Sequence, residues 1–408
     1  MEINNQKNDQ NIIPNDADKP QKGVNVPNLR FNHFDYKWNK VQLKNIVNVY
    51  DGTHQTPRYT KHGVQFVSVE DIKTLDKATK YISEEDFKNE FKISPKYGDI
   101  LMTRIGDIGT PAIVYNNNEL AYYVSLALLK PKKVLSSFLK FAIEANAFQK
   151  ELWKRSIHVA FPKKINKEEI GECKLSIPSN EEQKQVAELL LKIDERILTQ
   201  SKIIEDFETL KKGIWNHIYL TKSQDWECVK LSNILKERKD FALKNDEYVH
   251  ATLSKEGIFA KTERYDRDFL VTSEEKEYKI THLNDICYNP ANLKFGVICL
   301  NKYGDAIFSP IYVTYEVDKH YDPSFIELIL TSSSFIKYIR KYEQGTVYER
   351  MSVNSDDFLK GTILVPTKEM QKQIAEFFNI LSLKINKEKD ILELYKKQKA
   401  YLLKNMFI

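Results

Sequence analysis

Three short segments of this sequence contain residue types that catalysis uses, and each lacks part of the arrangement that the chemistry needs. Residues 289–292 (NPAN) begin like the Asn-Pro-Pro-aromatic motif that holds a flipped base for amino-methyl transfer, but the second proline and the aromatic residue are missing. Residues 106–109 (GDIG) form part of a phosphate loop without its Gly-Lys-Ser/Thr ending. Residues 182–184 (EQK) have the Glu-x-Lys spacing of metal-dependent nucleases without a preceding Pro-Asp.

The cysteines and histidines form no reactive or metal-binding pattern. Four cysteines are scattered along the chain, with no Cys-x-x-Cys pair. The eight histidines lack ligand spacing, and no Ser or Cys lies in a nucleophile elbow. We therefore expect no catalytic residue, metal or cofactor in this chain, and reduced cysteines in or near its cores.

Side chains suited to contacting nucleic acid gather in two regions at equivalent places in the sequence. Proteins read bases with Arg, Lys, Asn, Gln, Ser or Thr, and contact phosphates mainly with Lys and Arg. The first region contains Lys154, Arg155, His158, Lys163, Lys164 and Lys167. Its counterpart, residues 344–350, contains Thr346, Tyr348 and Arg350. A solvated surface is the competing interpretation.

Further candidates for contact with DNA are spread over both halves of the chain. They are Tyr59, Lys61, Thr103 and Arg104 in the first half, and Arg264, Tyr288, Asn289, Asn292 and Lys294 in the second. Two of them have a structural alternative. Arg104 lies between apolar residues and could pair with a buried carboxylate, and Tyr288 could belong to a core.

These residues belong to a module that occurs twice. Residues 177–219 align without a gap on residues 365–407, an offset of 188, and share a Gln-Lys-Gln sequence. The same offset relates the segment that begins at Trp38 to the one that begins at Trp226. Between these ends the copies diverge, as expected if each kept a scaffold and changed its specificity.

Each copy ends in a segment with the signals of a long helix. Ser179 is predicted as an N-cap that forms a capping box with Glu182, whereas Met370 cannot complete the box that begins at Thr367. Apolar residues then follow in steps of four and three. They are Val186, Leu190, Ile193, Ile197, Ile204, Phe207, Ile214 and Ile218 in copy one, and Ile374, Phe378, Leu381, Ile385, Leu392, Tyr395, Leu402 and Met406 in copy two. The seam is interrupted at equivalent places, at Gln200 and Lys211 and at Glu388 and Lys399.

The spacing of this seam is typical of a coiled coil, and about 41 residues at roughly 1.5 Å each give a rod of about 60 Å. We expect the two helices to pair antiparallel, with a domain at each end and pseudo-twofold symmetry between them. Apolar residues outside the seam, which a core would also explain, are candidates for contact with a partner subunit. They are Leu189, Ile203, Trp215, Phe377, Ile391 and Leu403.

The chain is therefore predicted to be an α+β protein with two domains joined by two long antiparallel coiled-coil helices. The expected boundaries are a flexible N-terminal arm at 1–36, domains at 37–178 and 223–366, and helices at 179–222 and 367–408. Within the domains, residues 65–69, 112–115, 296–300 and 311–315 are predicted as strands and residues 137–153 as one helix.

Charge differs between the two halves. Residues 37–176 contain 23 Lys and Arg against 16 Asp and Glu, whereas residues 220–366 contain 20 against 23. A basic balance favours a polyanion partner, and a net acidic domain can still carry a basic face. Because no run of 18 apolar residues and no secretory signal pattern occurs, we expect a soluble, cytoplasmic protein without a membrane partner.

Together these motifs resemble the specificity subunits of type I restriction-modification enzymes. Both copies open with a Trp-x-x-Val-x-Leu-x-Asn-Ile segment and contain a Gly-Asp-Ile-Leu or Asn-Asp-Ile-Cys-Tyr-Asn-Pro stretch. The most specific part is Pro-x-x-x-Glu-Gln-Lys-Gln-Val-Ala at the start of the first long helix, where copy two departs slightly, with Met370 in place of Glu182 and Ile374 in place of Val186. The resemblance extends from Trp38 to the C-terminus.

The resemblance implies a non-catalytic subunit that binds double-stranded DNA. Each target-recognition domain would read one half of a split, asymmetric sequence, while the helices set the spacing and dock two methylation subunits. Those subunits would supply S-adenosylmethionine and base flipping, and restriction subunits would add ATP- and Mg-dependent translocation and cleavage.

Two alternatives differ from this interpretation. A structural coiled-coil adaptor whose globular ends bind proteins would fit the net acidic second domain, and steep salt dependence of duplex binding would argue against it. A solitary specificity subunit of a related methylating nuclease would share the fold. A self-sufficient methyltransferase or nuclease lacks its motifs.

Overall fold

The computed structural model describes residues 25–159, 161–221, 225–243, 248–261, 277–345 and 351–408, which form two compact units. Unit 1 comprises Met1–Lys202 with Lys389–Ile408, and unit 2 comprises Ile203–Glu388. Each unit therefore contains part of both long helices, whereas the sequence suggested a separate segment for each helix. Four predicted contact residues lie outside the described residues: Arg264, Thr346, Tyr348 and Arg350.

The frame of unit 1 is a four-stranded antiparallel sheet. Its order is β2 (Val47–Asp51), β8 (Leu126–Pro131), β5 (Ile100–Thr103) and β6 (Pro111–Ile113). Side chains alternate across it, so that Ile100 and Met102 belong to one hydrophobic core and Leu101 to another. The first core also contains residues of α2 (Ser136–Glu144), α3 (Asn146–Arg155), α4 (Lys167–Glu172) and both long helices.

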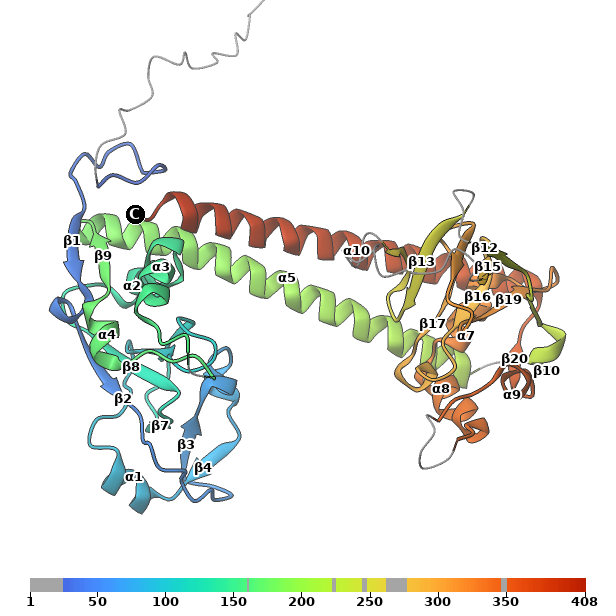
Figure 1. Ribbon diagram of the computed structural model, residues 1–408, viewed down its shortest axis with the longest axis horizontal. Helices are drawn as coiled ribbons and strands as arrows, with labels where there is room; N and C mark the ends of the chain where they lie inside the picture. The colour runs from blue at the N-terminus through green and yellow to red at the C-terminus, as the bar shows by residue number, and fades with distance from the viewer. Residues whose placement is uncertain (1–24, 160, 222–224, 244–247, 262–276, 346–350) are drawn as a thin grey trace, which may run out of the picture. The chain divides into compact units, whose positions relative to one another are not determined.

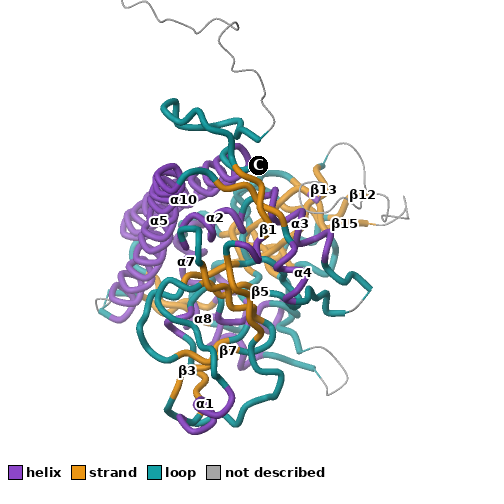
Figure 2. Tube along the Cα trace, turned by 90° about the vertical axis from the view of Figure 1, so that its left-hand side faces the viewer, coloured by secondary structure: helices purple, strands orange, loops and turns teal. Residues whose placement is uncertain are grey.

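The second core of unit 1 lies under a smaller sheet. The order of this sheet is β4 (Lys80–Ile82), β3 (Val64–Val67) and β7 (Leu120–Tyr122), and α1 (Glu84–Glu90) adds Phe87 to the core. Both views show α1 and β3 at the end of unit 1 that is remote from α2 and α3 (Figure 1 and Figure 2). The 3-10 helices η2 (Leu43–Asn45), η3 (Val69–Asp71) and η4 (Leu75–Lys77) lie in the connections.

Unit 2 repeats the frame of unit 1. In unit 1, β1 (Asn39–Gln42) pairs with β9 (Lys174–Ile177), and in unit 2, β10 (Glu227–Lys230) pairs with β20 (Thr362–Val365) in the same register, 188 residues on. The four-stranded sheet recurs as β11 (Leu235–Glu237), β19 (Val313–Val317), β16 (Ile286–Tyr288) and β17 (Ile298–Leu300). The helices recur as η5 (Leu231–Asn233), α7 (Pro323–Leu330), α8 (Ser333–Ile339) and α9 (Ser355–Leu359), with η7 (Leu293–Phe295) and η8 (Arg340–Tyr342) added.

The second sheet differs between the units. In unit 2 it has five strands in the order β12 (Phe241–Leu243), β15 (Glu277–Thr281), β18 (Ala306–Phe308), β13 (Val249–Ser254) and β14 (Gly257–Ala260). Three of these strands, β14, β13 and β18, repeat the order and directions of β4, β3 and β7 in unit 1. The repeat therefore continues into the outer sheet, to which unit 2 adds β15 and β12.

The long helices α5 (Asn180–Leu220) and α10 (Lys368–Asn405) run antiparallel inside each unit. In unit 1, Lys399 of α10 contacts Asp194 of α5, and in unit 2, Lys211 of α5 contacts Ser382 of α10. Every predicted seam residue is buried or half-buried. The antiparallel pairing and the α+β class are therefore confirmed, while the symmetry between the two domains stays a prediction.

Two details differ from the sequence prediction. The helix expected at residues 137–153 is two helices, because Ala145 adopts an extended backbone (φ −68°, ψ 142°) between α2 and α3. Residues 30 and 31, which lie within the flexible arm expected at 1–36, are anchored, since Arg30 forms an ion pair with Glu182 (2.7 Å) and Phe31 packs on the first core. Among the described residues no helix is long and apolar enough to cross a membrane.

Candidate nucleic-acid interface

The predicted basic cluster of unit 1 extends from the end of α3 over the loop between α3 and α4. This loop folds back on itself, because the backbone N–H of Ile157 donates to the carbonyl of Lys164 (2.8 Å). Its second arm is also fixed to the turn after β5, where the N–H of Gly106 donates to the carbonyl of Lys163 (2.8 Å). The loop is therefore held at its base by backbone hydrogen bonds to itself and to a neighbouring turn.

Arg104 supports the base of this loop from inside the fold. Its side chain is only 5% exposed, forms an ion pair with Asp51, and donates from Nε to the carbonyl of Ile165 (3.0 Å). Breaking a buried pair of this kind costs about 3–5 kcal/mol. The alternative interpretation, a pair with a buried carboxylate, is the one that the structure supports, and we withdraw Arg104 from the candidate DNA contacts.

The charges on the loop fall into two groups. Lys154 and Arg155 have acidic partners, at 3.4 Å from Glu151 and 3.0 Å from Glu169 respectively. Lys163 and Lys164 are exposed, and neither ammonium group forms an ion pair within the described part of the chain. Because an unpaired cation on a surface attracts polyanions most strongly, Lys163 and Lys164 are the better placed of the predicted contacts.

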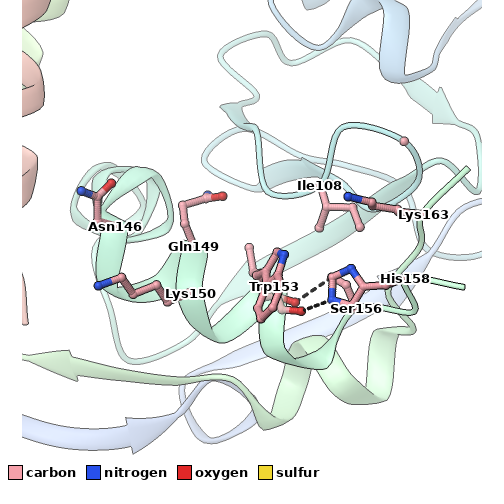
Figure 3. Close-up of a pocket in the computed structure, with 10 residues that line it drawn as sticks. Ile108, Asn146, Gln149, Lys150, Trp153, Ser156, His158 and Lys163 are labelled. Carbon is pink, nitrogen blue, oxygen red and sulfur yellow. Dashed lines mark hydrogen bonds between the residues drawn. The ribbon is translucent and has the colours of Figure 1, made fainter.

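Beside the loop is a cavity of about 400 Å³ that aromatic and basic side chains line (Figure 3). The ring of His158 lies against the ring of Trp153, with 4.7 Å between their centroids, and its Nε2 is 2.8 Å from the Trp153 carbonyl oxygen. Figure 3 shows Trp153 between Lys150 and Lys163, both of which border the cavity. The structure thus brings His158 and Lys163 together with two residues that the sequence reasoning missed.

A signal for Trp153 was present in the sequence. Phe148 and Leu152 are spaced four residues apart and form the buried face of α3, so Trp153 falls outside that face. A large aromatic side chain outside the apolar face of a helix is 65% exposed here. Lys150, on the same helix, carried no signal that separates it from an ordinary solvated lysine.

The remaining candidates of unit 1 lie elsewhere. Tyr59 is half exposed and Lys61 fully so, and both border a separate cavity beside Ser83 and Glu84. Thr103 is fully buried, and its hydroxyl accepts a hydrogen bond from the Thr110 N–H (2.9 Å). We withdraw Thr103, because a strand residue inside the core has no surface to offer to a groove.

In unit 2, the segment Tyr288 to Asn292 is a structural turn. Tyr288 is fully buried and donates from its hydroxyl to the carbonyl of Val353 (3.0 Å), and burial raises its pKa well above the ordinary range. The side-chain oxygen of Asn289, which is 8% exposed, accepts from the Ala291 N–H (3.1 Å). Tyr288 and Asn289 are therefore withdrawn as DNA contacts, while Asn292 and Lys294 are half-buried and stay predictions.

The residues proposed for contact with a partner subunit divide by exposure. Phe377 (46% exposed) and Ile391 (37%) lie on the open face of α10, whereas Leu189, Ile203 and Leu403 are half-buried. Trp215 is a correction, since it is 8% exposed and packs against Phe378 in the core of unit 2. The structure adds exposed apolar residues that were not predicted: Ile380, Leu383 and Leu394 on α10, and Leu198 and Leu210 on α5.

Comparison with known proteins shows which family the first half of this chain is similar to. Residues 36–208 match the family of the type I restriction modification DNA specificity domain. This part of the chain is similar to that family. The matched residues include the sheets of unit 1, the basic loop and most of α5, and the match agrees with the resemblance inferred from the sequence motifs.

Two relatives from Methanocaldococcus jannaschii are similar to part of this chain. The type I restriction enzyme MjaVIII specificity subunit is 28% identical over 197 residues, which cover 44% of each chain. The putative type I restriction enzyme MjaX specificity subunit is 31% identical over 226 residues, 48% of this chain and 52% of the relative. The match thus spans about half the length of these relatives.

Solved structures share the fold over almost the whole chain. The S subunit of a type I restriction-modification system from M. genitalium has a TM-score of 0.60 at 13% identity, covering 94% of this chain and 99% of that one. A chain of a second type I system has a TM-score of 0.53 at 10% identity, covering 90% and 98%. Unit 2 therefore has the fold of a specificity subunit as well, although its sequence has diverged.

Proposed function

We propose that this chain is the non-catalytic, sequence-specific DNA-binding subunit of a type I restriction-modification enzyme, and that each unit reads one half of a bipartite, asymmetric site. The observation that carries the proposal is one frame built twice with the same strand register, under outer sheets of three and five strands. A repeated frame presents two readers in the same way, and different outer sheets present different side chains to DNA.

The lysines of the unit 1 loop support duplex DNA as the ligand. Lys150, Lys163 and Lys164 form no ion pair among the described residues, and their neighbour Trp153 is largely exposed. Neutralising phosphates releases counterions, so such a surface makes binding steeply dependent on salt. A protein adaptor would have no reason to show this dependence together with a preference for one sequence.

The partners form a second part of the proposal. The open face of α10 carries Phe377, Ile380, Leu383, Ile391 and Leu394 at 37–68% exposure, and one chain alone leaves these side chains in water. Covering such a stripe with protein is favourable by roughly 25 cal/mol per Å² of apolar surface. We infer that methylation subunits bind along the long helices and supply S-adenosylmethionine, and that restriction subunits supply the ATP- and Mg-dependent steps.

Selection of random duplexes with the full chain tests the DNA-binding part. We expect two different half-sites at a fixed spacing, and a slope of log K against log salt that becomes shallower by about 0.9 for each phosphate contact removed. The double variant Lys163→Gln/Lys164→Gln should weaken all sequences alike. Lys92→Gln, an exposed lysine next to α1, is the matched control.

Two outcomes would overturn the proposal in different ways. Recovery of unrelated sequences would remove the specific DNA-binding function. Recovery of two identical inverted half-sites would leave DNA binding in place and overturn the asymmetric reading.

A further inference from the structure

The tip of the α3–α4 loop carries two apolar side chains in full contact with solvent. Val159 is 98% exposed and Phe161 is 102% exposed, so neither touches the rest of the chain to any extent. Burying a side chain of this size is worth about 1.5–3 kcal/mol. Single exposed apolar residues are common on surfaces, but here two project from the tip of one short loop.

The loop holds this tip in place from below. Ile157 and Lys164 pair across its base, and Ile105 pairs with Lys164 from the neighbouring turn. Beneath them, the buried Arg104 side chain joins the carbonyl of Ile165 to Asp51. The exposed tip therefore stands on a base that is hydrogen-bonded on both sides and tied to a buried ion pair.

The surroundings of the tip select its partner by charge. Lys163 and Lys164 follow Phe161 after one residue, Pro162, and Lys150 lies across Trp153 from Lys163 (Figure 3). The acidic groups that face this region, Glu151 and Glu169, are within 3.4 Å of Lys154 and Arg155. An apolar tip with unpaired cations around it complements a partner that is apolar inside and anionic outside, which describes stacked base pairs between phosphate backbones.

We propose that Phe161, assisted by Val159, inserts into a base step of the bound duplex and unstacks it, while Lys150, Lys163 and Lys164 contact the flanking phosphates. Apolar wedges of this kind kink a duplex by about 20–90° and cost a few kcal/mol of unstacking, which the additional contact repays. The inference depends on the proposed DNA-binding function and names the residue that deforms the DNA. Since flexible pyrimidine–purine steps unstack most easily, the wedge would add sequence preference at a position without a base contact.

Fluorescence of 2-aminopurine tests the wedge with the full chain and the duplex recovered by selection. Placed in turn at each step of the half-site bound by unit 1, the probe should brighten several-fold at one step. Phe161→Ala should abolish that signal and the bend measured by end-to-end energy transfer. Phe161→Leu should keep part of both, because leucine is also an apolar wedge. Tyr36→Ala removes a similarly exposed aromatic residue (84%) of unit 1 as the control.

A mismatch at the same step makes the test independent of the fluorophore. A mismatched step is easier to unstack than a paired one. The mismatch should therefore tighten DNA binding of the wild-type chain by roughly tenfold and leave the affinity of Phe161→Ala unchanged. Phe161 is fully exposed, so the melting temperature of the variant should equal that of the wild type.

The two levels of the proposal fail separately. A chain that binds its bipartite site with an unchanged bend and unchanged 2-aminopurine signal after Phe161→Ala would overturn the wedge and leave the DNA-binding function intact. The wedge would also be overturned if the only effect of Phe161→Ala were a loss of assembly with a protein partner. A chain that selects no duplex would remove the function on which the wedge depends.

Discussion

The two units differ in a way that separates scaffold from reader. The strand pairs β1–β9 and β10–β20 keep one register at an offset of 188, and the four-stranded sheets have the same order. The outer sheets have three and five strands. The shared part is the part that contacts the long helices, and packing against a helix pair of fixed geometry constrains backbone and side chains alike. The outer sheet has no such partner. Its strands β4, β3 and β7 recur as β14, β13 and β18, and unit 2 adds β15 and β12.

Within the shared frame, one buried amide has the same role in both units. Gln183 donates to the carbonyl of Pro178 (3.1 Å) and accepts from the Leu135 N–H (3.0 Å). Gln371 donates to the carbonyl of Pro366 (2.9 Å) and accepts from the Asp322 N–H (2.9 Å). The Pro and Gln of the repeated helix start thus join each long helix to the beginning of a domain helix.

The residue before each of these glutamines differs between the two units. Glu182 is 1% exposed and accepts from Arg30 (2.7 Å) and from the Trp38 indole (3.1 Å), whereas Met370, its equivalent, is 44% exposed. The residue equivalent to Arg30 is Ile218, which belongs to α5. In the described part of unit 2, α5 therefore occupies the place in the sequence of the segment that covers Glu182 in unit 1.

The largest effect is expected for Glu182→Met, which gives unit 1 the residue that unit 2 has at the equivalent position, Met370. It leaves the Arg30 guanidinium and the Trp38 N–H without their carboxylate, at a cost of about 3–5 kcal/mol. Urea unfolding should report this loss, and hydrogen exchange should locate it in residues 25–38 and the start of α5. A loss below 1 kcal/mol would show that the N-terminal segment does not stabilise unit 1.

Gln183→Leu and Gln371→Leu should each lower the free energy of unfolding by about 2 kcal/mol, because each leaves a buried carbonyl and a partly buried N–H without its partner. Equal losses would confirm that the two helix starts are equivalent. A difference above 1 kcal/mol between them would break the comparison. Lys184→Gln, one residue on and exposed, is the control.

A smaller effect is expected at the seam interruptions. Lys399 contacts Asp194 and Glu144, whereas Lys211, its equivalent, donates to the Ser382 hydroxyl (2.7 Å). Asp194→Ser should destabilise unit 1 by about 1 kcal/mol, and Ser382→Asp should stabilise unit 2 by up to that amount. Urea unfolding in low and high salt checks both, since an ion pair should weaken with salt.

The pH dependence of this pair has a definite sign. Burial lowers the pKa of the Lys399 ammonium, but Glu144 and Asp194 outweigh burial and raise its pKa above the ordinary lysine value. A group whose pKa is raised in the folded state contributes its full stabilisation below its unfolded-state pKa. That stabilisation is lost as pH rises through its folded-state pKa. The difference in stability between the wild type and Lys399→Met should therefore persist at neutral pH and shrink as the solution becomes strongly alkaline.

The smallest effect is expected for Met370→Glu, the reverse of the first exchange. Glutamate at this position completes a capping box with Thr367, whose hydroxyl lies 3.5 Å from the Met370 N–H, and should add no more than about 0.5 kcal/mol. Thermal unfolding should detect a slight gain or none. A gain as large as the loss in Glu182→Met would mean that unit 2 possesses a partner equivalent to Arg30.

The sequence by itself determined the duplication, the two long helices and their seam, because apolar spacing and cap residues act locally and repeat at one offset. It also indicated the basic loop of unit 1, since a cluster of lysines in one segment needs no tertiary contact to be recognised. The α+β class followed from the same local signals.

Only the tertiary structure decided which candidates reach the surface. Arg104, Thr103 and Tyr288 have the side chains of DNA readers, but residues distant in sequence bury them, among them Asp51 at 53 and Val353 at 65 positions away. Trp153 and Phe161 have the side chains of a core and are exposed instead. Burial depends on which elements meet in space, and long-range packing determines that, whereas spacing along the chain records only the face on which a residue lies.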